Sequence, residues 1–155
     1  MKKKLTAFLS FCFIFLLPLS LQGCGCASSS NAANLSFSAD DVKYVELFAG
    51  PVPTATEKKI ITGEKDIQNI IALFDELTTT RRVRDSDLLS GGIANIFRFQ
   101  LVNGESQVVY ASLNQIFNAN GHFIVNNDEL GSYAFWLSLP YETVKVSEDD
   151  LPIIE

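Results

Sequence analysis

The sequence contains few of the residues from which most catalytic and metal-binding sites are built. Its 155 residues include one histidine, His122, and three cysteines, Cys12, Cys24 and Cys26. A zinc site needs several His or Cys ligands at short spacing, which this chain does not supply. A Ser-His-Asp triad would have to use His122, yet the sequence has no Gly-x-Ser-x-Gly motif to expose a serine. We therefore predict that the protein is not an enzyme and uses no metal and no cofactor.

Basic residues are also in the minority. The chain has 12 Lys and Arg against 18 Asp and Glu, a net charge of −6. Three of the lysines stand at positions 2–4, so without them 9 basic residues would face 18 acidic ones, a net charge of −9. A strongly acidic protein repels the phosphates of nucleic acids, and we expect no nucleic acid among its partners.

The first 24 residues have the pattern of a bacterial lipoprotein signal. Three lysines precede residues 5–21, which carry no charge, as in a secretory signal peptide. An uncleaved helical anchor is the alternative, but about 17 residues barely span a bilayer. Residues 21–24 (Leu-Gln-Gly-Cys) resemble a lipobox, in which a small residue precedes the thiol that accepts a diacylglyceryl group. We predict lipidation of Cys24, which would attach the chain to the extracytoplasmic face of the cell membrane.

Composition divides the chain into three parts. We predict a signal peptide over residues 1–23, the lipidated cysteine with a flexible Ser/Ala/Asn linker over 24–41, and a single small α+β domain over 42–155. The linker is rich in small and polar residues, which cannot bury a core. The remaining length is enough for one small domain and not for two.

Apolar periodicity predicts one helix and several strands. Between residues 64 and 78, apolar side chains recur at the spacing of one helix face; they are Ile67, Ile70, Ile71, Phe74 and Leu77. Thr62 is expected to cap the start of this helix. Runs typical of strands cover residues 42–49, 58–62, 96–102, 107–113, 122–125 and 144–146. The expected fold class is α+β: a mostly antiparallel sheet of about five to seven strands with one amphipathic helix packed on a face.

Two segments allow a finer prediction. Asn103-Gly104 separates two strand-like runs and predicts a type I′ hairpin turn, which needs positive φ at both positions. In the run before it, Phe97 and Phe99 should face one side of the sheet and Arg98 the other. Residues 132–139 could form a helix, but their apolar alternation favours a strand.

Two places are candidates for binding. Arg81, Arg82 and Arg84 stand together in an acidic chain, and on a strand Arg82 and Arg84 share one side, where they could grip a carboxylate or phosphate. The alternative is an exposed strand edge whose charges prevent aggregation. On a strand, Trp136 would point away from its neighbours Tyr133 and Phe135, toward a sugar or a partner. Burial of Trp136 under the helix is the alternative.

Three stretches resemble a family of small lipoproteins from Gram-positive Firmicutes that carry an uncharacterised domain. They are the lipobox with its Ser/Asn linker, residues 67–71 running into 80–85 (Thr-Arg-Arg-Val-Arg-Asp), and residues 140–146 (Pro-Tyr-Glu-Thr-Val-Lys-Val). Arg84 and the lack of a Pro just after Asp85 depart from the family pattern. The resemblance implies a location and a fold, and no activity.

The function that these features favour is a non-enzymatic binding or accessory module at the cell surface. The expected partners are the membrane, through the lipid on Cys24, and an envelope protein. Two alternatives stay open, namely an envelope hydrolase that uses carboxylates and an interaction protein that inhibits or protects an envelope enzyme.

The lipid anchor generates the first testable prediction. Cys24→Ala removes the thiol that would carry the diacylglyceryl group, so acylation should be lost and the chain should accumulate as uncleaved precursor or be shed. Metabolic labelling with palmitate, followed by membrane fractionation, measures this. Unchanged labelling in Cys24→Ala would show that Cys24 is not the lipidated residue.

Overall fold

A computed structural model describes residues 35–51, 57–83 and 93–150. Within these ranges the chain forms one sheet of eight antiparallel strands in the order β3-β7-β6-β5-β4-β1-β2-β8. The strands are β1 (Val42–Pro51), β2 (Glu57–Ile61), β3 (Thr79–Arg82), β4 (Ile93–Leu101), β5 (Ser106–Ser112), β6 (Gln115–Asn118), β7 (Gly121–Val125) and β8 (Thr143–Lys145). The predicted α+β class is therefore confirmed. The strand number exceeds five to seven because the short strands β3 and β6 were not predicted.

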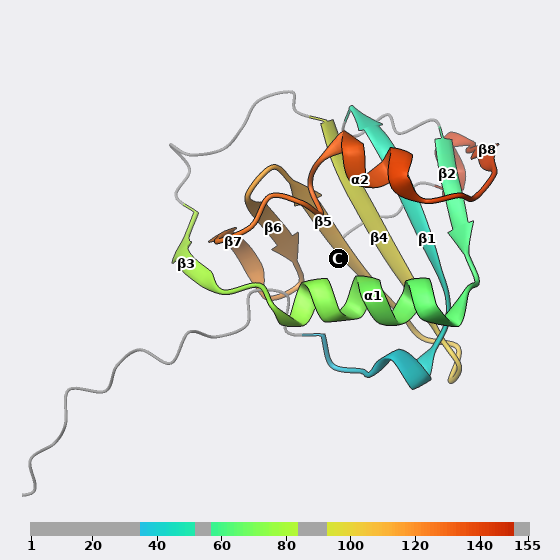
Figure 1. The fold of residues 1–155 in the computed structure, drawn as a ribbon, viewed down its shortest axis with the longest axis horizontal. Coiled ribbons are helices and arrows are strands. Elements are labelled where there is room, and N and C mark those ends of the chain that lie inside the picture. The colour runs from blue at the N-terminus through green and yellow to red at the C-terminus, as the bar shows by residue number, and fades with distance from the viewer. Residues whose placement is uncertain (1–34, 52–56, 84–92, 151–155) are drawn as a thin grey trace, which may run out of the picture.

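Two helices cover one face of this sheet. Helix α1 (Glu64–Asp75) and helix α2 (Tyr133–Ser138) lie in front of the strands in Figure 1. The core lies between them and the sheet. In its centre, the ring of Phe74 from α1 packs edge-on against Phe97 and Phe99 of β4, at centroid distances of 5.0 and 5.6 Å. All five apolar residues of the predicted helix face are buried, so this face packs on the sheet as expected.

The start of α1 is capped by a distant tyrosine. Thr62 is not the N-cap as predicted; Gly63 occupies that position and has no side chain to accept a hydrogen bond. The Tyr141 hydroxyl takes this role, accepting from the Gly63 N–H at 3.1 Å and donating to Asp66 Oδ2 at 2.7 Å. A Cβ at Gly63 would lie 2.5 Å from this hydroxyl oxygen, so the close approach requires glycine here.

The packed part of the chain begins before Val42. Residues 35–41 were expected to belong to the flexible linker, but Leu35 and Phe37 pack against the core. The rings of Phe37 and Phe99 lie 5.2 Å apart. A short 3-10 helix, η1 (Ala39–Asp41), follows, and Ser38 and Asp41 form a capping box at its start. The linker boundary at residue 41 is therefore wrong, because Phe37 supplies apolar surface that the sheet buries.

The β4–β5 hairpin forms where Asn103-Gly104 predicted it, with a different turn. Gly104 has a φ of 90°, but Asn103 has no positive φ. The Gly104 N–H donates to Leu101 O at 3.1 Å, and the Leu101 N–H donates to Glu105 O at 2.9 Å. This is a three-residue loop with glycine in the left-handed region, and not the two-residue type I′ turn.

Residues 133–138 form a helix and not the predicted strand. The Ser132 hydroxyl accepts from the Phe135 N–H at 3.1 Å and so caps the helix start. At the other end, Lys59 Nζ donates to the carbonyl oxygens of Trp136 and Leu139, at 2.8 and 2.6 Å. A lysine from a neighbouring strand stabilises this end, which sequence alternation could not reveal.

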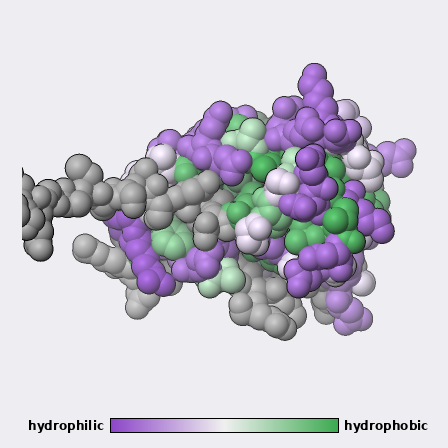
Figure 2. Space-filling view, turned by 90° about the horizontal axis from the view of Figure 1, so that it is seen from below, coloured by the Kyte–Doolittle hydropathy of each residue, from purple (hydrophilic) through white to green (hydrophobic). Residues whose placement is uncertain are grey.

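The outer side of α1 is polar, since Glu64, Lys65, Gln68 and Asn69 are exposed. Figure 2 views the molecule from below and shows hydrophilic side chains over much of the face turned to the viewer, with hydrophobic side chains between them. Among the described residues, neither helix has the length and apolar character that crossing a membrane requires.

The capping of α1 generates a stability prediction. Tyr141→Phe removes the hydroxyl that accepts from Gly63 and donates to Asp66, so we expect the free energy of unfolding of the full chain to fall by about 1 kcal/mol. Tyr133→Phe is the matched control, because Tyr133 is exposed and its change should stay within about 0.5 kcal/mol. Urea unfolding followed by circular dichroism measures both. Equal stability of the two variants would refute the capping role.

Candidate functional site

Of the two arginines that were predicted to converge on one anion, the structure describes Arg82. Arg82 lies exposed on β3, at the edge of the sheet, opposite Phe123 of β7. Its guanidinium lies along β7, since a Cβ at Gly121 would be 2.9 Å from Arg82 Nη2. Arg84 lies outside the described residues, so convergence of Arg82 and Arg84 on one anion stays a prediction. The edge position matches the alternative interpretation of this segment as a charged sheet edge.

Trp136 belongs to the core and not to a binding surface. Its exposed fraction is 3%, because it lies on the sheet-facing side of α2. The Lys59 ammonium sits 4.9 Å from its ring centroid, and burial lowers the pKa of Lys59. The prediction of Trp136 as an exposed anchor is wrong, because it assumed a strand in which alternate residues face outward.

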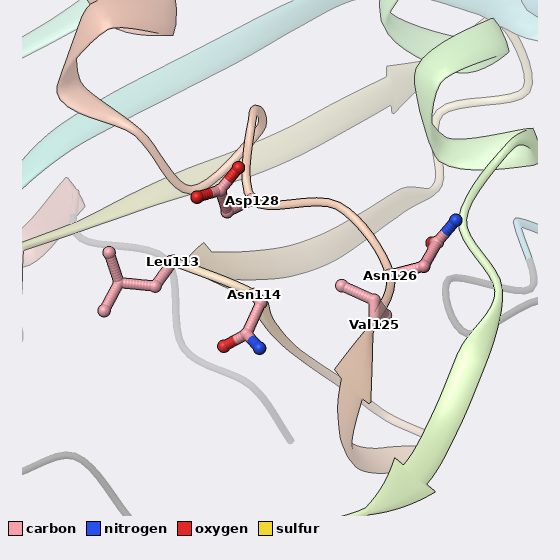
Figure 3. A pocket seen from close by; sticks show the side chains of 5 residues that line it. All are labelled: Leu113, Asn114, Val125, Asn126 and Asp128. Carbon is pink, nitrogen blue, oxygen red and sulfur yellow. The ribbon is translucent and has the colours of Figure 1, made fainter.

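A pocket opens between the β5–β6 turn and the segment that follows β7. It has a volume of about 470 Å³ and is lined by Leu113, Asn114, Val125, Asn126 and Asp128. Figure 3 shows that these side chains do not converge, since Leu113 and Asn126 point away from each other. The Asn126 carboxamide already accepts from the Thr78 N–H at 2.9 Å. The pocket is therefore a polar recess with one acidic side chain, Asp128, and with the apolar Leu113 at its rim.

The rim residue Leu113 has a strained backbone. Its φ is 49°, and it is the one non-glycine residue with a positive φ in the described part of the chain. It pairs with Gly131, where a Cβ would lie 2.4 Å from both Leu113 N and Leu113 O. Gly131 thus permits a close backbone approach that holds Leu113 in place. The left-handed conformation costs a branched residue about 1–2 kcal/mol.

Leu113 also exposes its side chain. Its exposed fraction is 55%, so more than half of this apolar side chain stays in contact with solvent. Tyr133 and Leu137, four residues apart on α2, are exposed as well, and α2 begins two residues after Gly131. Strained backbone conformations cluster at ligand clamps and other functional sites, which makes Leu113 a candidate contact residue.

The opposite face of the sheet carries four linked charges, which we call the ion-pair cluster: Glu46, Lys58, Arg98 and Asp150. Glu46 Oε1 lies 2.6 Å from Lys58 Nζ, and Glu46 Oε2 lies 2.5 Å from Arg98 Nε. Asp150 Oδ2 lies 2.6 Å from Lys58 Nζ, and Asp150 Oδ1 lies 2.8 Å from Arg98 Nη2. Each carboxylate therefore bridges both cations in a closed ring.

The contacts within this ring shift the pKa values of its members. Desolvation would raise the pKa of Glu46, but hydrogen bonds from Arg98 and Lys58 outweigh it and leave this pKa below its ordinary value. Hydrogen bonds from Lys58 and then Arg98 lower the pKa of Asp150. Desolvation opposes the charge of Lys58, yet its hydrogen bonds to Asp150 and Glu46 raise its pKa overall. All four groups are consequently charged at neutral pH.

The lone histidine lies in a row of rings on this same face. Phe117 of β6 stands opposite Tyr110 of β5 and His122 of β7, with ring centroids 6.1 and 5.5 Å from it. Burial lowers the pKa of His122. Over the described ranges, no group of three or more His, Cys, Asp or Glu side chains is placed to hold a metal ion.

No family model matches the chain, and neither a curated protein nor a solved structure matches it. The resemblance to Firmicutes lipoproteins stays a prediction.

Sequence reasoning missed both Leu113 and the ion-pair cluster. Leu113-Asn114 lies between strands, and Asn is a common turn residue, but nothing in the sequence assigns positive φ to the leucine. The cluster joins β1 to β4 across 52 residues and joins β2 to the end of the described chain across 92 residues. Alternation placed Arg98 on the correct face of the sheet. Its partners could be identified only from the strand order, which the sequence does not reveal.

The ion-pair cluster generates a prediction on pH. Because its pKa is lowered in the folded chain, Asp150 contributes stability that is present above its unfolded value, 3.8, and is lost as the pH falls through the folded value. Asp150→Asn should therefore unfold more easily than the wild type at pH 7, and the difference should vanish in acid. Chemical unfolding across a pH series measures this.

The control for this prediction is Asp149→Asn, which removes the same charge one residue earlier from an exposed position. Its stability should follow the wild type at every pH. A constant difference between Asp150→Asn and the wild type down to strong acid would rule out a charge-dependent role of Asp150.

Proposed function

We propose that the protein is a lipoprotein, anchored through Cys24 to the extracytoplasmic face of the membrane, whose domain is a non-enzymatic binding module. Support for the anchor comes from the cationic start, the uncharged run and the lipobox at residues 21–24. A diacylated cysteine holds a protein on a bilayer without a membrane-spanning helix, because each buried methylene contributes about 0.8 kcal/mol.

The proposal of a binding module rests on Leu113, which combines a positive φ with an exposed apolar side chain. An apolar side chain that stays more than half exposed in a costly backbone conformation is well explained by burial in a complex. Its neighbours Asn114 and Asp128, which also line the pocket, would form the polar rim around an apolar anchor, as at protein interfaces. The expected partner is therefore an envelope protein with an apolar recess for Leu113.

The place of Leu113 in the fold suits contact with a partner. β5 runs from the β4–β5 hairpin to Leu113, and the Val102 N–H in that hairpin donates to Asp41 O at 2.9 Å. The described chain thus begins near the Val102 end of β5, whereas Leu113 follows the other end of β5 and pairs with Gly131, two residues before α2. The anchor would leave the Leu113 end accessible.

The test compares two exposed apolar turn residues. Leu113→Asn keeps a residue that tolerates positive φ but removes the apolar anchor. Partner capture by chemical crosslinking in native membranes should fall about tenfold, as for loss of about 1.4 kcal/mol of binding. The same variant should raise the free energy of unfolding by up to about 1 kcal/mol, because the strain is relieved.

Val102→Asn is the matched control, since Val102 is 66% exposed and has no positive φ. It should change neither stability nor the yield of crosslinked partner, which is quantified by mass spectrometry. If Leu113→Asn captured the same partners in the same yield as Val102→Asn, the Leu113 site would be excluded as the contact.

A further inference from the structure

We propose that Lys58 and Arg98 form a binding site for the carboxylate of an extended acidic peptide, and that the chain fills this site with its own Asp150. The site lies on the sheet face opposite the helices and is independent of Leu113. Three features support this site. Other residues hold the two cations in place without Asp150, and Glu46 neutralises only one of their two positive charges. The contacts to the segment that ends in Asp150 are also of the kind that proteins make to a bound peptide.

The two cations are held by the sheet itself. Glu46 of β1, whose side chain is 7% exposed, binds Lys58 of β2 on one side and Arg98 of β4 on the other. Both cations also lie over the ring of Phe48, at 5.5 and 5.0 Å from its centroid. These groups belong to the three neighbouring strands β2, β1 and β4, so the cation pair would persist if Asp150 left.

Charge balance requires an anion at this place. Lys58 and Arg98 carry two positive charges, and the buried Glu46 neutralises one of them. The remaining positive charge lies among partly buried groups, where it attracts a counter-ion more strongly than on an open surface. Asp150 supplies that counter-ion, and its side chain is 41% exposed, so its site opens to solvent.

The contacts recognise a peptide as well as a carboxylate. Arg98 Nη1 donates to the backbone oxygen of Asp150 at 3.3 Å while Nη2 binds the carboxylate. Upstream, β8 pairs antiparallel with β2, so that Val144 stands opposite Lys58. An extended strand added to a sheet edge, followed by a gripped side chain, is a common mode of peptide recognition.

The resident segment is held by few other contacts. β8 has three residues, and all of them are exposed. Val146 is the hydrophobic residue of this segment that packs against Phe48 and Ile96. Exchange of this segment for an acidic peptide of a partner thus requires breaking the contacts of Asp150 to Lys58 and Arg98, the short pairing of β8 with β2 and the packing of Val146.

The test uses a fluorescent peptide with the sequence of residues 143–150 and the full chain in mild detergent. The wild type carries its own competing carboxylate, so Asp150→Asn should bind the peptide about tenfold more tightly, a difference of about 1.4 kcal/mol. Asp149→Asn, the matched control, should bind like the wild type. Fluorescence anisotropy gives the dissociation constants, and about 1 M salt should weaken binding.

Two further comparisons guard against an unfolded variant. Val146→Ser loosens the resident segment and leaves all four charges in place, so it should also bind the peptide more tightly than the wild type. A peptide with Asn in place of its final Asp should bind either variant at least about tenfold more weakly. Equal binding by wild type, Asp150→Asn and Val146→Ser, or equal binding of the two peptides, would overturn the proposal.

Discussion

The register of β1 between β2 and β4 is the constraint on which the rest of this structure depends. Along β1, Val45 and Leu47 face the helices, whereas Glu46 faces the opposite side. A slip of one residue would turn the Glu46 carboxylate into the apolar core and would expose the residues that α1 covers. The two cations that flank Glu46 fix this register from both sides, because a buried carboxylate without partners would be far too costly.

Much of the fold followed from alternation and helical spacing, since both report which side of an element is buried. The opposite directions of Phe97 and Arg98 and the buried stripe of α1 are of this kind. Features that depend on tertiary contacts could not be predicted from these patterns. Residues 133–138 are helical because Lys59 satisfies the carbonyl groups at the helix end, and α1 is capped by Tyr141 because Gly63 leaves room for its hydroxyl.

The candidate site was less accessible to sequence reasoning. Trp136 was expected to face outward on an assumed strand, but residues 133–138 form a helix that turns it inward. The positive φ of Leu113 has no sequence signature, and its close backbone contact is with Gly131, eighteen residues later in the chain. Arg82 lies on an exposed edge of the sheet, which was the alternative interpretation of the arginine segment. A site that combines a turn, a distant glycine and a helix start appears only once the strands are paired.

The wide sequence separation within the ion-pair cluster has a consequence for how the chain reaches its native state. Glu46 and Lys58 are synthesised early, Arg98 follows 52 residues after Glu46, and Asp150 follows 92 residues after Lys58. The central strand β1 cannot bury its carboxylate until β4 exists, and the ring closes only with the last described residue. Long-range pairing of this kind slows folding. A chain still being synthesised would therefore lack the contacts that complete this face of the sheet until residue 150 has been made.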